Sequence, residues 1–355
     1  MIKVGLLNFH YSQNNYGAVL QAAALQEFLI SKGYSPENIN FRPKTVTKSL
    51  KPRLLLKIKQ LVKLIFNNKS EFDNFRDIYI KEGELFHDST KLKKISANYE
   101  AIVVGSDQVW RPNYTSPNTM VYFLSNIEVG VKAISYAASF GVEDWSESHD
   151  ITLDITTALK RFSSISVRED SGKDICRDIF GVEVQHVLDP TLLVDSSFFE
   201  QIIGNDKVLG SDIVYYKLDA SDKFHNMVSR IEESKGYSSE NIYKTKGKFG
   251  TKYISVKDWL YKIKHSKLVI TDSFHCICFA IIFKKQFIYY PNDERGMARI
   301  QSLLSSFGLS NRILYKEKDV EELLESEIDY DMVEKELYKR KIHSEKFLLD
   351  SLLNG

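Results

Sequence analysis

The sequence predicts an α/β fold in which two doubly wound domains face a cleft. A chain of 355 residues is long enough for two domains. Short apolar strands alternate with helical segments along most of it, as in parallel α/β sheets. The alternation pauses at a Pro-containing segment, His186–Val194, and then restarts. We therefore expect an N-terminal domain over residues 1–195, a C-terminal domain over 196–330, and a helix over 331–355 that packs back on the body.

The composition is that of an ordinary globular chain, with 43% hydrophobic and 27% charged residues. A formal net charge of +1 argues against a nucleic-acid-binding protein. The three cysteines (Cys176, Cys276 and Cys278) fit neither a disulfide framework nor a metal site, so a reducing compartment is expected. Met1–Leu7 lacks the regions of a signal peptide, and no apolar run reaches ~18 residues. We expect a cytoplasmic protein.

The chain opens with a strand, a polar loop and a helix, over residues 2–7, 8–17 and 18–32. The order resembles the start of a dinucleotide-binding fold, but the loop lacks the glycine pattern GxGxxG. A nicotinamide cofactor is therefore not supported. Asn14 and Asn15 in this loop instead suggest hydrogen bonds to a polyhydroxylated ligand.

A basic segment follows, because no acidic residue occurs between Glu37 and Glu71. Within residues 51–69, leucine, isoleucine, valine and phenylalanine recur at helical spacing among lysines and arginines. Such a helix can lie on an anionic membrane surface, or it can pack its apolar stripe on its own chain. The pattern leaves both readings open. A second helix is expected over residues 72–79.

Two further strands of the first array end in loops that carry candidate ligand-binding residues. The strand at 101–104 runs into Asp107 and Gln108, and Asp107 either holds or deprotonates a hydroxyl, or it caps the next turn. Strands are also expected over 131–138 and 165–167. Arg168 follows the latter, in a loop expected to extend to Gly172. It is either paired with a neighbouring acidic residue or free to bind an anion.

The second array repeats the alternation. Strands are expected over residues 212–217, 241–243, 268–270 and 287–290. Helices are expected over residues 224–235, 256–264, 274–283, 298–307, 320–325 and 332–353.

The segment Lys267–Phe287 carries the strongest candidate site. Ser273 is a natural N-cap between a buried strand and an apolar helix, which places His275 in the first helical turn. A helix N-terminus at the carboxyl end of a parallel strand favours an anionic ligand. Arg295 and Arg299 follow in a polar stretch and could bind the same anion. The spacing alone does not exclude the simpler case, in which His275 caps its helix and the arginines form surface pairs.

Six motifs in this order resemble the polysaccharide pyruvyltransferase family, over about residues 2 to 312. They are NNYGAVLQ (14–21), GSDQVW (105–110), SVREDSG (166–172), VLDPTLL (187–193), TDSFHCICFAIIFKK (271–285) and RIQSLLSSFGL (299–309). The chain departs from the pattern at Cys276, where many relatives have glycine. The resemblance implies two Rossmann-like domains in a glycosyltransferase-B-like arrangement, and transfer of pyruvate from phosphoenolpyruvate to a sugar as a cyclic ketal. It also implies that Arg168, His275 and Arg295 contact phosphoenolpyruvate.

The chemistry of this reaction suggests a role for each residue type. Guanidinium groups suit the phosphate and carboxylate of the donor, so we assign Arg168, Arg295 and, more weakly, Arg299 to it. His275 is the expected general acid/base, with Ser273 beside it.

The remaining polar candidates are assigned to the acceptor. We expect Asp107, Gln108, Asn14 and Asn15 to bind the sugar diol, of a capsule, exopolysaccharide or cell-wall glycan that is either free or lipid-linked. No cofactor, metal or nucleic acid is expected. In the lipid-linked case, the segment at 51–69 would bring the protein to the inner face of the membrane. The alternative function is a glycosyltransferase of the same fold that uses a nucleotide sugar.

Overall fold

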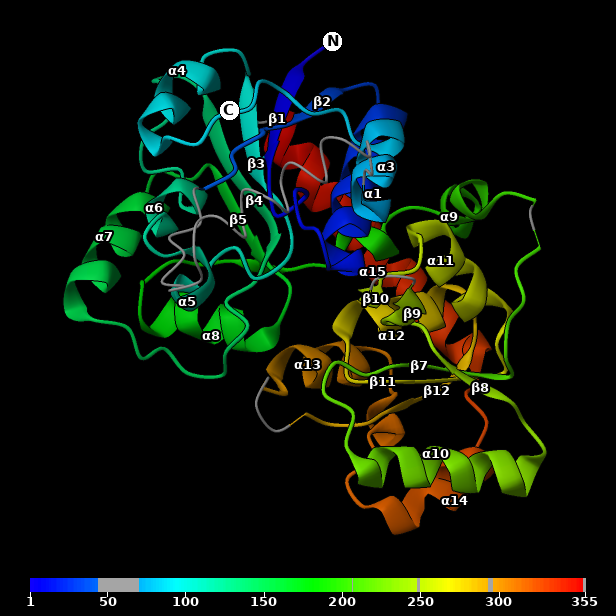
Figure 1. Ribbon diagram of the computed structural model, residues 1–355. Helices are drawn as coiled ribbons and strands as arrows, with labels where there is room; N and C mark the ends of the chain where they lie inside the picture. Colours follow the sequence, from blue (N-terminus) through cyan, green and yellow to red (C-terminus); the bar gives the residue numbers. More distant parts are fainter. Residues whose placement is uncertain (44–69, 206, 248–249, 293–295, 354–355) are drawn as a thin grey trace, which may run out of the picture.

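The computed structural model describes residues 1–43, 70–205, 207–247, 250–292 and 296–353 (Figure 1). The basic segment 51–69 and Arg295 lie outside the described residues. The remaining predicted site residues are described, and two parallel sheets account for the expected α/β architecture.

The first sheet has six strands in the order β2-β1-β3-β4-β5-β6, all parallel. Their bounds are β1 Lys3–Leu7, β2 Ser35–Asn38, β3 Ala101–Val104, β4 Lys132–Ala138, β5 Ser164–Val167 and β6 Gln185–His186. The short edge strands β2 and β6 are not predicted by the sequence, because neither has the apolar run of a buried strand.

Helices cover both faces of this sheet. Successive residues of a strand point to opposite faces, and in the inner strands the residues on both faces are mostly apolar. Val4 and Leu6 of β1 pack with α1 (Tyr16–Ser31) and α15 (Tyr330–Leu353). Leu7 and the opposite face pack with a second group of helices. This group includes α4 (Leu92–Ser96), α6 (Thr119–Tyr122), α7 (His149–Leu159) and α8 (Asp170–Asp178), and the short helix α5 (Pro112–Thr115) contacts α6. Helix α3 (Glu71–Tyr79) lies beside α1 (Figure 1).

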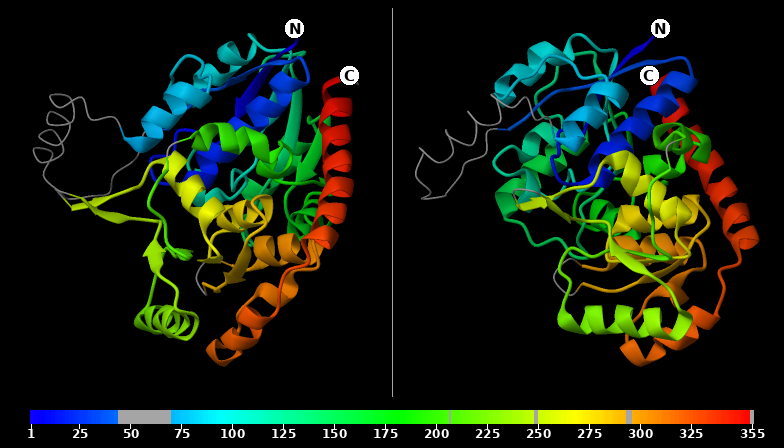
Figure 2. Two further views of the ribbon diagram at one scale, coloured as in Figure 1. Left: turned by 90° about the vertical axis from the view of Figure 1, so that its right-hand side faces the viewer. Right: turned by 45° about the vertical axis from the view of Figure 1, so that its right-hand side comes forward.

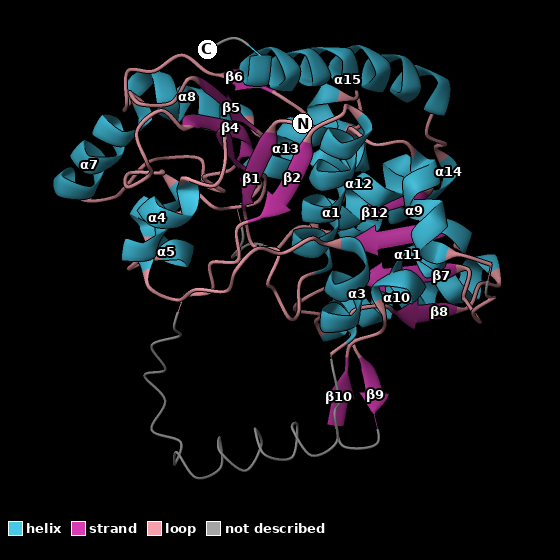
Figure 3. Ribbon diagram, turned by 90° about the horizontal axis from the view of Figure 1, so that it is seen from above, coloured by secondary structure: helices cyan, strands magenta, loops and turns pink. Residues whose placement is uncertain are grey.

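The second sheet has four parallel strands in the order β12-β11-β7-β8. Their bounds are β7 Ile213–Tyr216, β8 Ser239–Asn241, β11 Leu268–Thr271 and β12 Gln286–Tyr289. Helices α10 (Asp222–Lys235) and α14 (Val320–Glu325) pack on one face. The other face packs with α9 (Ser196–Ile203), α11 (Val256–His265), α12 (Phe274–Ile282) and α13 (Ala298–Ser306). A hairpin of β9 (Thr245–Gly247) and β10 (Gly250–Lys252) extends from the body (Figure 3).

The two halves share one continuous hydrophobic cluster, in which the start of α1 packs against the second sheet's helices. Tyr16 stacks on Trp259 with ring centroids 5.0 Å apart and an angle of 7° between the rings. Its hydroxyl donates a hydrogen bond to the carbonyl of Ile254 at 2.9 Å. The N-terminus of α1 is therefore held directly against the second half, which brings the loops of both sheets together.

Helix α15 returns from the second half to the first, along one side of the molecule (Figure 2). Leu348 and Leu352 are buried against the first sheet, and Ser344 accepts a hydrogen bond from the backbone N–H of Leu188 at 3.0 Å. The chain thus crosses between the halves twice, near Leu188 and through α15. We propose the division at residues 195/196, with 331–355 as the returning helix.

Three local expectations need correction. The loop after Arg168 is shorter than predicted, because α8 already begins at Asp170. The segment His186–Val194 is not only a connection: it holds the end of β6 and a 3-10 turn, η2 (Pro190–Leu192). The expected strand at 241–243 lies two residues earlier, as β8.

Candidate active site

His275 lies where the sequence predicts it, in the first turn of α12 after strand β11. Ser273 is the N-cap, and its hydroxyl accepts a hydrogen bond from the backbone N–H of Cys276 at 3.4 Å. The remainder of α12 is buried almost completely, because Phe274–Ile281 are apolar or small on all sides. This burial fixes the helix in place and holds the imidazole at the boundary between the two halves.

The imidazole of His275 contacts residues of the first half on two sides. Its Nε2 atom lies 3.4 Å from Nη1 of Arg168 and 3.4 Å from Oδ2 of Asp189. Its Nδ1 atom faces Gly17 of α1, where an added Cβ would lie only 2.0 Å away. A side chain at position 17 would occupy the space of the ring. Glycine is therefore required there for the imidazole to reach the Arg168–Asp189 pair.

Arg168 follows strand β5 and is buried, with a side-chain exposure of 1%. Its Nη1 atom donates to Oδ2 of Asp189 at 2.9 Å and to the hydroxyl of Ser106 at 3.2 Å. The Phe274 ring stacks on the guanidinium at 4.2 Å. Burial works against the charge, but Asp189, Asp107 and Glu169 together raise the pKa of Arg168, which therefore stays charged.

Two guanidinium nitrogens of Arg168 make no hydrogen bond to the described residues. Nε and Nη2 are buried and have no hydrogen-bond partner among the described residues, and the nearest carboxylate oxygen, on Asp107, lies 3.9 Å from Nη2. Buried guanidinium donors are normally satisfied. A pair of unused donors on a fixed cation is the arrangement expected of a site that binds an anion bidentately.

Asp189 is a member of this cluster that sequence reasoning missed. Its Oδ2 also accepts a hydrogen bond from the Ser106 hydroxyl at 2.8 Å, while its Oδ1 accepts from the backbone and hydroxyl of Thr191 at 3.0 and 2.7 Å. Burial acts to raise the pKa of Asp189, but the charges and hydrogen bonds of His275 and Arg168 hold it well below its usual range. The sequence signal was an Asp-Pro step after a strand, which we read as a connection.

Asp107 and Gln108 lie at the end of β3, beside Arg168. The Asp107 carboxylate accepts a hydrogen bond from the backbone N–H of Gln108 at 2.9 Å, so part of its role is to shape its own turn. Its backbone is left-handed, with φ of 83°, a conformation that concentrates at functional sites. The Gln108 side chain accepts from Nη1 of Arg111 at 2.7 Å and rests on Gly141, where a Cβ would lie 2.1 Å from Oε1.

The predicted asparagines have different surroundings. Asn15 is the N-cap of α1, and its Oδ1 atom accepts from the backbone N–H of Ala18 at 3.2 Å. Asn14 is exposed, and its Oδ1 atom accepts from the Ser12 hydroxyl at 3.3 Å. The Asn15 oxygen is thus used by the helix that carries Gly17, and the Asn14 side chain is open to solvent.

Arg299 reaches the same region from the first turn of α13. Removal from bulk solvent and the nearby charge of Arg168 lower the pKa of Arg299, while Glu169 and Asp107 act in the opposite direction. Glu169 is held in place because its Oε1 atom accepts from the Ser139 hydroxyl at 2.8 Å and from the backbone N–H of Gly141 at 3.0 Å. Two guanidiniums and two carboxylates therefore surround the end of β5.

Within the described residues, no group of three or more His, Cys, Asp or Glu side chains is placed to hold a metal ion. The same residues include no helix that is long and apolar enough to span a membrane.

The sequence model of the polysaccharide pyruvyl transferase family matches residues 15–294, which is more than half of the chain. The chain belongs to this family. Membership makes the protein a pyruvyltransferase of polysaccharide biosynthesis, and it implies a phosphoenolpyruvate donor and a polysaccharide acceptor. A search of curated proteins finds no match.

Solved structures resemble the fold at low sequence identity. The UDP-GlcNAc 2-epimerase from Neisseria meningitidis, bound to UDP-GlcNAc, has 10% identity and a TM-score of 0.50, with 100% of both chains covered. A Listeria monocytogenes protein assigned as a UDP-N-acetylglucosamine 2-epimerase has 11% identity and a TM-score of 0.54, covering 98% of this chain and 95% of that chain. At such identity the likeness shows the fold alone, which is the expected glycosyltransferase-B-like pair of Rossmann-like domains.

Proposed function

We propose that this pyruvyltransferase joins the three-carbon unit of phosphoenolpyruvate to two hydroxyls of one sugar as a cyclic ketal, with release of inorganic phosphate. The methylene carbon gains a proton, and one sugar oxygen bonds to C2. The C2–O bond to phosphate then breaks and the second hydroxyl closes the ring. The observation that carries the proposal is the contact of His275 with Arg168, beside two unused guanidinium donors.

The donor has two anionic groups, and the cluster offers matching cations. Nε and Nη2 of Arg168 are free to bind one group bidentately. Arg299 supplies a second guanidinium nearby, and the N-terminus of α12 adds partial positive charge. We assign Arg295 to the same role from the family resemblance. Because Arg168 is fixed by Asp189 and Ser106, its free nitrogens are preorganised for the departing phosphate.

We assign His275 as the general acid that protonates the methylene carbon, and as the base that accepts a proton from the attacking hydroxyl. Asp189 positions the imidazole, since its carboxylate lies 3.4 Å from Nε2. Arg168 lies at the same distance from Nε2, and its charge is balanced by Asp189. The Asp189 carboxylate therefore holds both side chains in place.

The acceptor diol is assigned to the loops of the first half and to Ser273 at the start of α12. Asp107 lies next to Arg168, and Gln108, Asn14, Asn15 and the Ser273 hydroxyl supply further polar atoms. Of these, Asn15 and Gln108 already use one side-chain oxygen each within the protein, so they would contact a sugar through their amide nitrogens. The acceptor is either a free glycan or a lipid-linked precursor.

The decisive test measures which donor is consumed. Unmodified glycan extracted from cells that lack the protein is incubated with phosphoenolpyruvate or with sugar nucleotides. We expect phosphate release and a glycan that gains the mass of a pyruvate ketal. Release of nucleoside diphosphate, with no phosphate from phosphoenolpyruvate, would instead establish a glycosyltransferase.

The role of His275 is tested in the same assay. His275→Ala should lower kcat by at least ~100-fold. His225→Ala, on the exposed side of α10, is the matched control and should leave the rate unchanged. An unchanged rate after His275→Ala would remove the imidazole from the mechanism.

A lipid-linked acceptor makes a separate prediction for the basic segment 51–69. The protein should bind anionic liposomes at low salt, and binding should weaken as salt is added. A protein that fails to bind such liposomes at low salt would eliminate the membrane contact and leave the transfer reaction itself untouched.

A further inference from the structure

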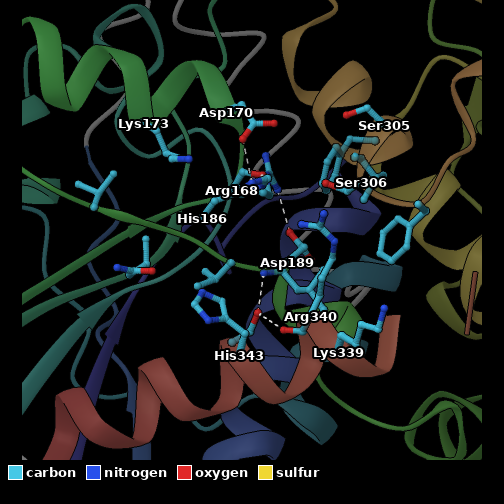
Figure 4. Close-up of a pocket in the computed structure, with 18 residues that line it drawn as sticks. Arg168, Asp170, Lys173, His186, Asp189, Ser305, Ser306, Lys339, Arg340 and His343 are labelled. Atoms are coloured by element: carbon cyan, nitrogen blue, oxygen red, sulfur yellow. Dashed lines mark hydrogen bonds and ion pairs between the residues drawn. The ribbon is translucent and has the colours of Figure 1, made fainter. Parts of the chain in front are cut away.

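A cavity of about 700 Å³ lies between α8, the end of β6, α13 and α15 (Figure 4). It adjoins the candidate active site: Arg168, Asp189 and Phe274 line it, whereas His275, Asp107 and Arg299 do not. Nη2 of Arg168 lies 3.9 Å from Oδ1 of Asp107, and the Phe274 ring covers the guanidinium at 4.2 Å.

The cavity is rich in positive charge. Lys173 on α8 and Arg340 on α15 reach it from opposite walls, and His186, Lys339 and His343 also line it (Figure 4). The charge of Lys173 is among the causes that lower the pKa of Asp170, on the same wall. Arg340 uses Nε to bind Glu336 at 2.9 Å, which leaves its terminal nitrogens for a ligand.

The carboxylates of the cavity are already engaged. Asp170 lies 3.1 Å from Nδ1 of His186 and accepts a hydrogen bond from the Ser302 hydroxyl at 3.0 Å. Asp189 is paired with Arg168 at 2.9 Å. Among the residues that line the cavity, the cations Arg168, Lys173, Lys339 and Arg340 outnumber the carboxylates Asp170 and Asp189, and an anionic ligand would supply further negative charge.

We propose that this cavity is a second binding site, for a small molecule that carries a phosphate or diphosphate group. A volume of about 700 Å³ suits a ligand of nucleotide or sugar-phosphate size. A guanidinium and an ammonium on opposite walls suit the several oxygens of a phosphate group. The hydroxyls of Ser305 and Ser306 line the same space and add hydrogen-bonding groups.

A ligand in this cavity would contact both halves of the molecule. Its walls come from α8 and β6 of the first half, from α13 of the second, and from α15, which joins the two. A bound phosphate would link these elements and sit directly behind the Arg168–Asp189 pair. Occupancy should therefore change the KM for phosphoenolpyruvate, a consequence that rests on the proposed function, whereas the binding itself does not.

The test uses inorganic pyrophosphate as the probe, titrated calorimetrically into the full-length protein with phosphoenolpyruvate in excess to block the donor site. We expect one pyrophosphate per chain. The double variant Lys173→Gln/Arg340→Gln should bind it at least about tenfold more weakly, because two charge-assisted hydrogen bonds are lost. Arg177→Gln/Arg230→Gln removes the same charge from exposed arginines outside the cavity and should bind like the wild type.

Further measurements identify the kind of molecule that carries the phosphate, and they test this site independently of the proposed function. Uridine diphosphate and geranyl diphosphate distinguish a nucleotide from a lipid headgroup. Arg299→Gln weakens the donor site and should leave pyrophosphate binding unchanged, even if no pyruvyl transfer is found. The proposal is overturned if pyrophosphate fails to bind at millimolar concentration, if Arg299→Gln abolishes binding, or if the Lys173/Arg340 variant binds as tightly as the wild type.

Discussion

Gly17→Ala tests the geometry of the active site without touching a charged or polar group. A Cβ at position 17 would lie 2.0 Å from Nδ1 of His275 and 2.3 Å from its Cγ atom. Ordinary van der Waals contact begins at 3.4 Å, so the ring has to move by about 1.4 Å. A displacement near 1 Å from the reacting geometry costs about 100-fold in rate. We therefore expect kcat/KM to fall by about two orders of magnitude.

Stability should change much less than activity. Alanine is favoured over glycine in a helix by up to about 1 kcal/mol, whereas overpacking costs about 1–3 kcal/mol. The net loss in the free energy of unfolding should be about 2 kcal/mol or less. Gly210→Ala is the control, since the nearest atom to its added Cβ is Oε1 of Glu240 at 4.0 Å.

The assay is phosphate release from phosphoenolpyruvate with the unmodified glycan as acceptor, together with urea unfolding. In a His275→Ala background the ring is absent, so Gly17→Ala should cost no further activity and should not destabilise the protein. Wild-type kcat/KM in the Gly17→Ala single variant would refute the reasoning. So would a loss of stability of equal size in the presence and absence of the imidazole.

Three other perturbations follow from contacts in the active site and around buried His10. Asp189→Asn removes the carboxylate that pairs with buried Arg168. The free energy of unfolding, measured by urea denaturation, should therefore fall by about 3–5 kcal/mol. An unchanged denaturation midpoint would contradict the pairing. Arg299→Gln should raise the KM for phosphoenolpyruvate by about tenfold or more with little change in stability, and an unaltered KM would remove it from the donor site. Burial and the charges of Arg42 and Arg76 lower the pKa of His10 from 6.5 to about 3, so only the unfolded chain takes up this proton between those values. Lowering the pH from 6.5 to 4.5 should therefore reduce the free energy of unfolding by about 2 kcal/mol, and His10→Gln should flatten this part of the profile.

Much of the secondary structure was predictable because its signals are local. The apolar runs of β3 and β11, the Ser273 N-cap and the helix periodicity of α10 and α11 each depend on neighbours within a few residues. The edge strands β2 and β6 were missed because their residues are mostly polar or exposed and are defined by the strand beside them. Helix α9 was missed because it follows directly on the segment that the sequence indicated as a connection.

The residues of the candidate site also fall into two groups, those predicted from the sequence and those seen only in the structure. His275 and Arg168 were predicted as ligand-binding residues because each follows a strand that ends at the carboxyl edge of a parallel sheet. The family resemblance implied that both contact phosphoenolpyruvate, whereas their own contact, at 3.4 Å across 107 residues of sequence, is seen only in the structure. Gly17 and Asp189 were not singled out, since a glycine in a helix and an Asp-Pro step have many ordinary roles.

The sequence by itself determined the α/β class, the family and the residue types that a phosphorylated donor needs, because these are written in local patterns and in the order of motifs. Only the tertiary structure decided which side chains share a charge, which glycine makes room for the imidazole, and that a basic cavity lies behind Arg168. These depend on how two sheets and a returning helix meet. Contacts of that kind are set by the packing of surfaces far apart in the chain, and no window of sequence contains them.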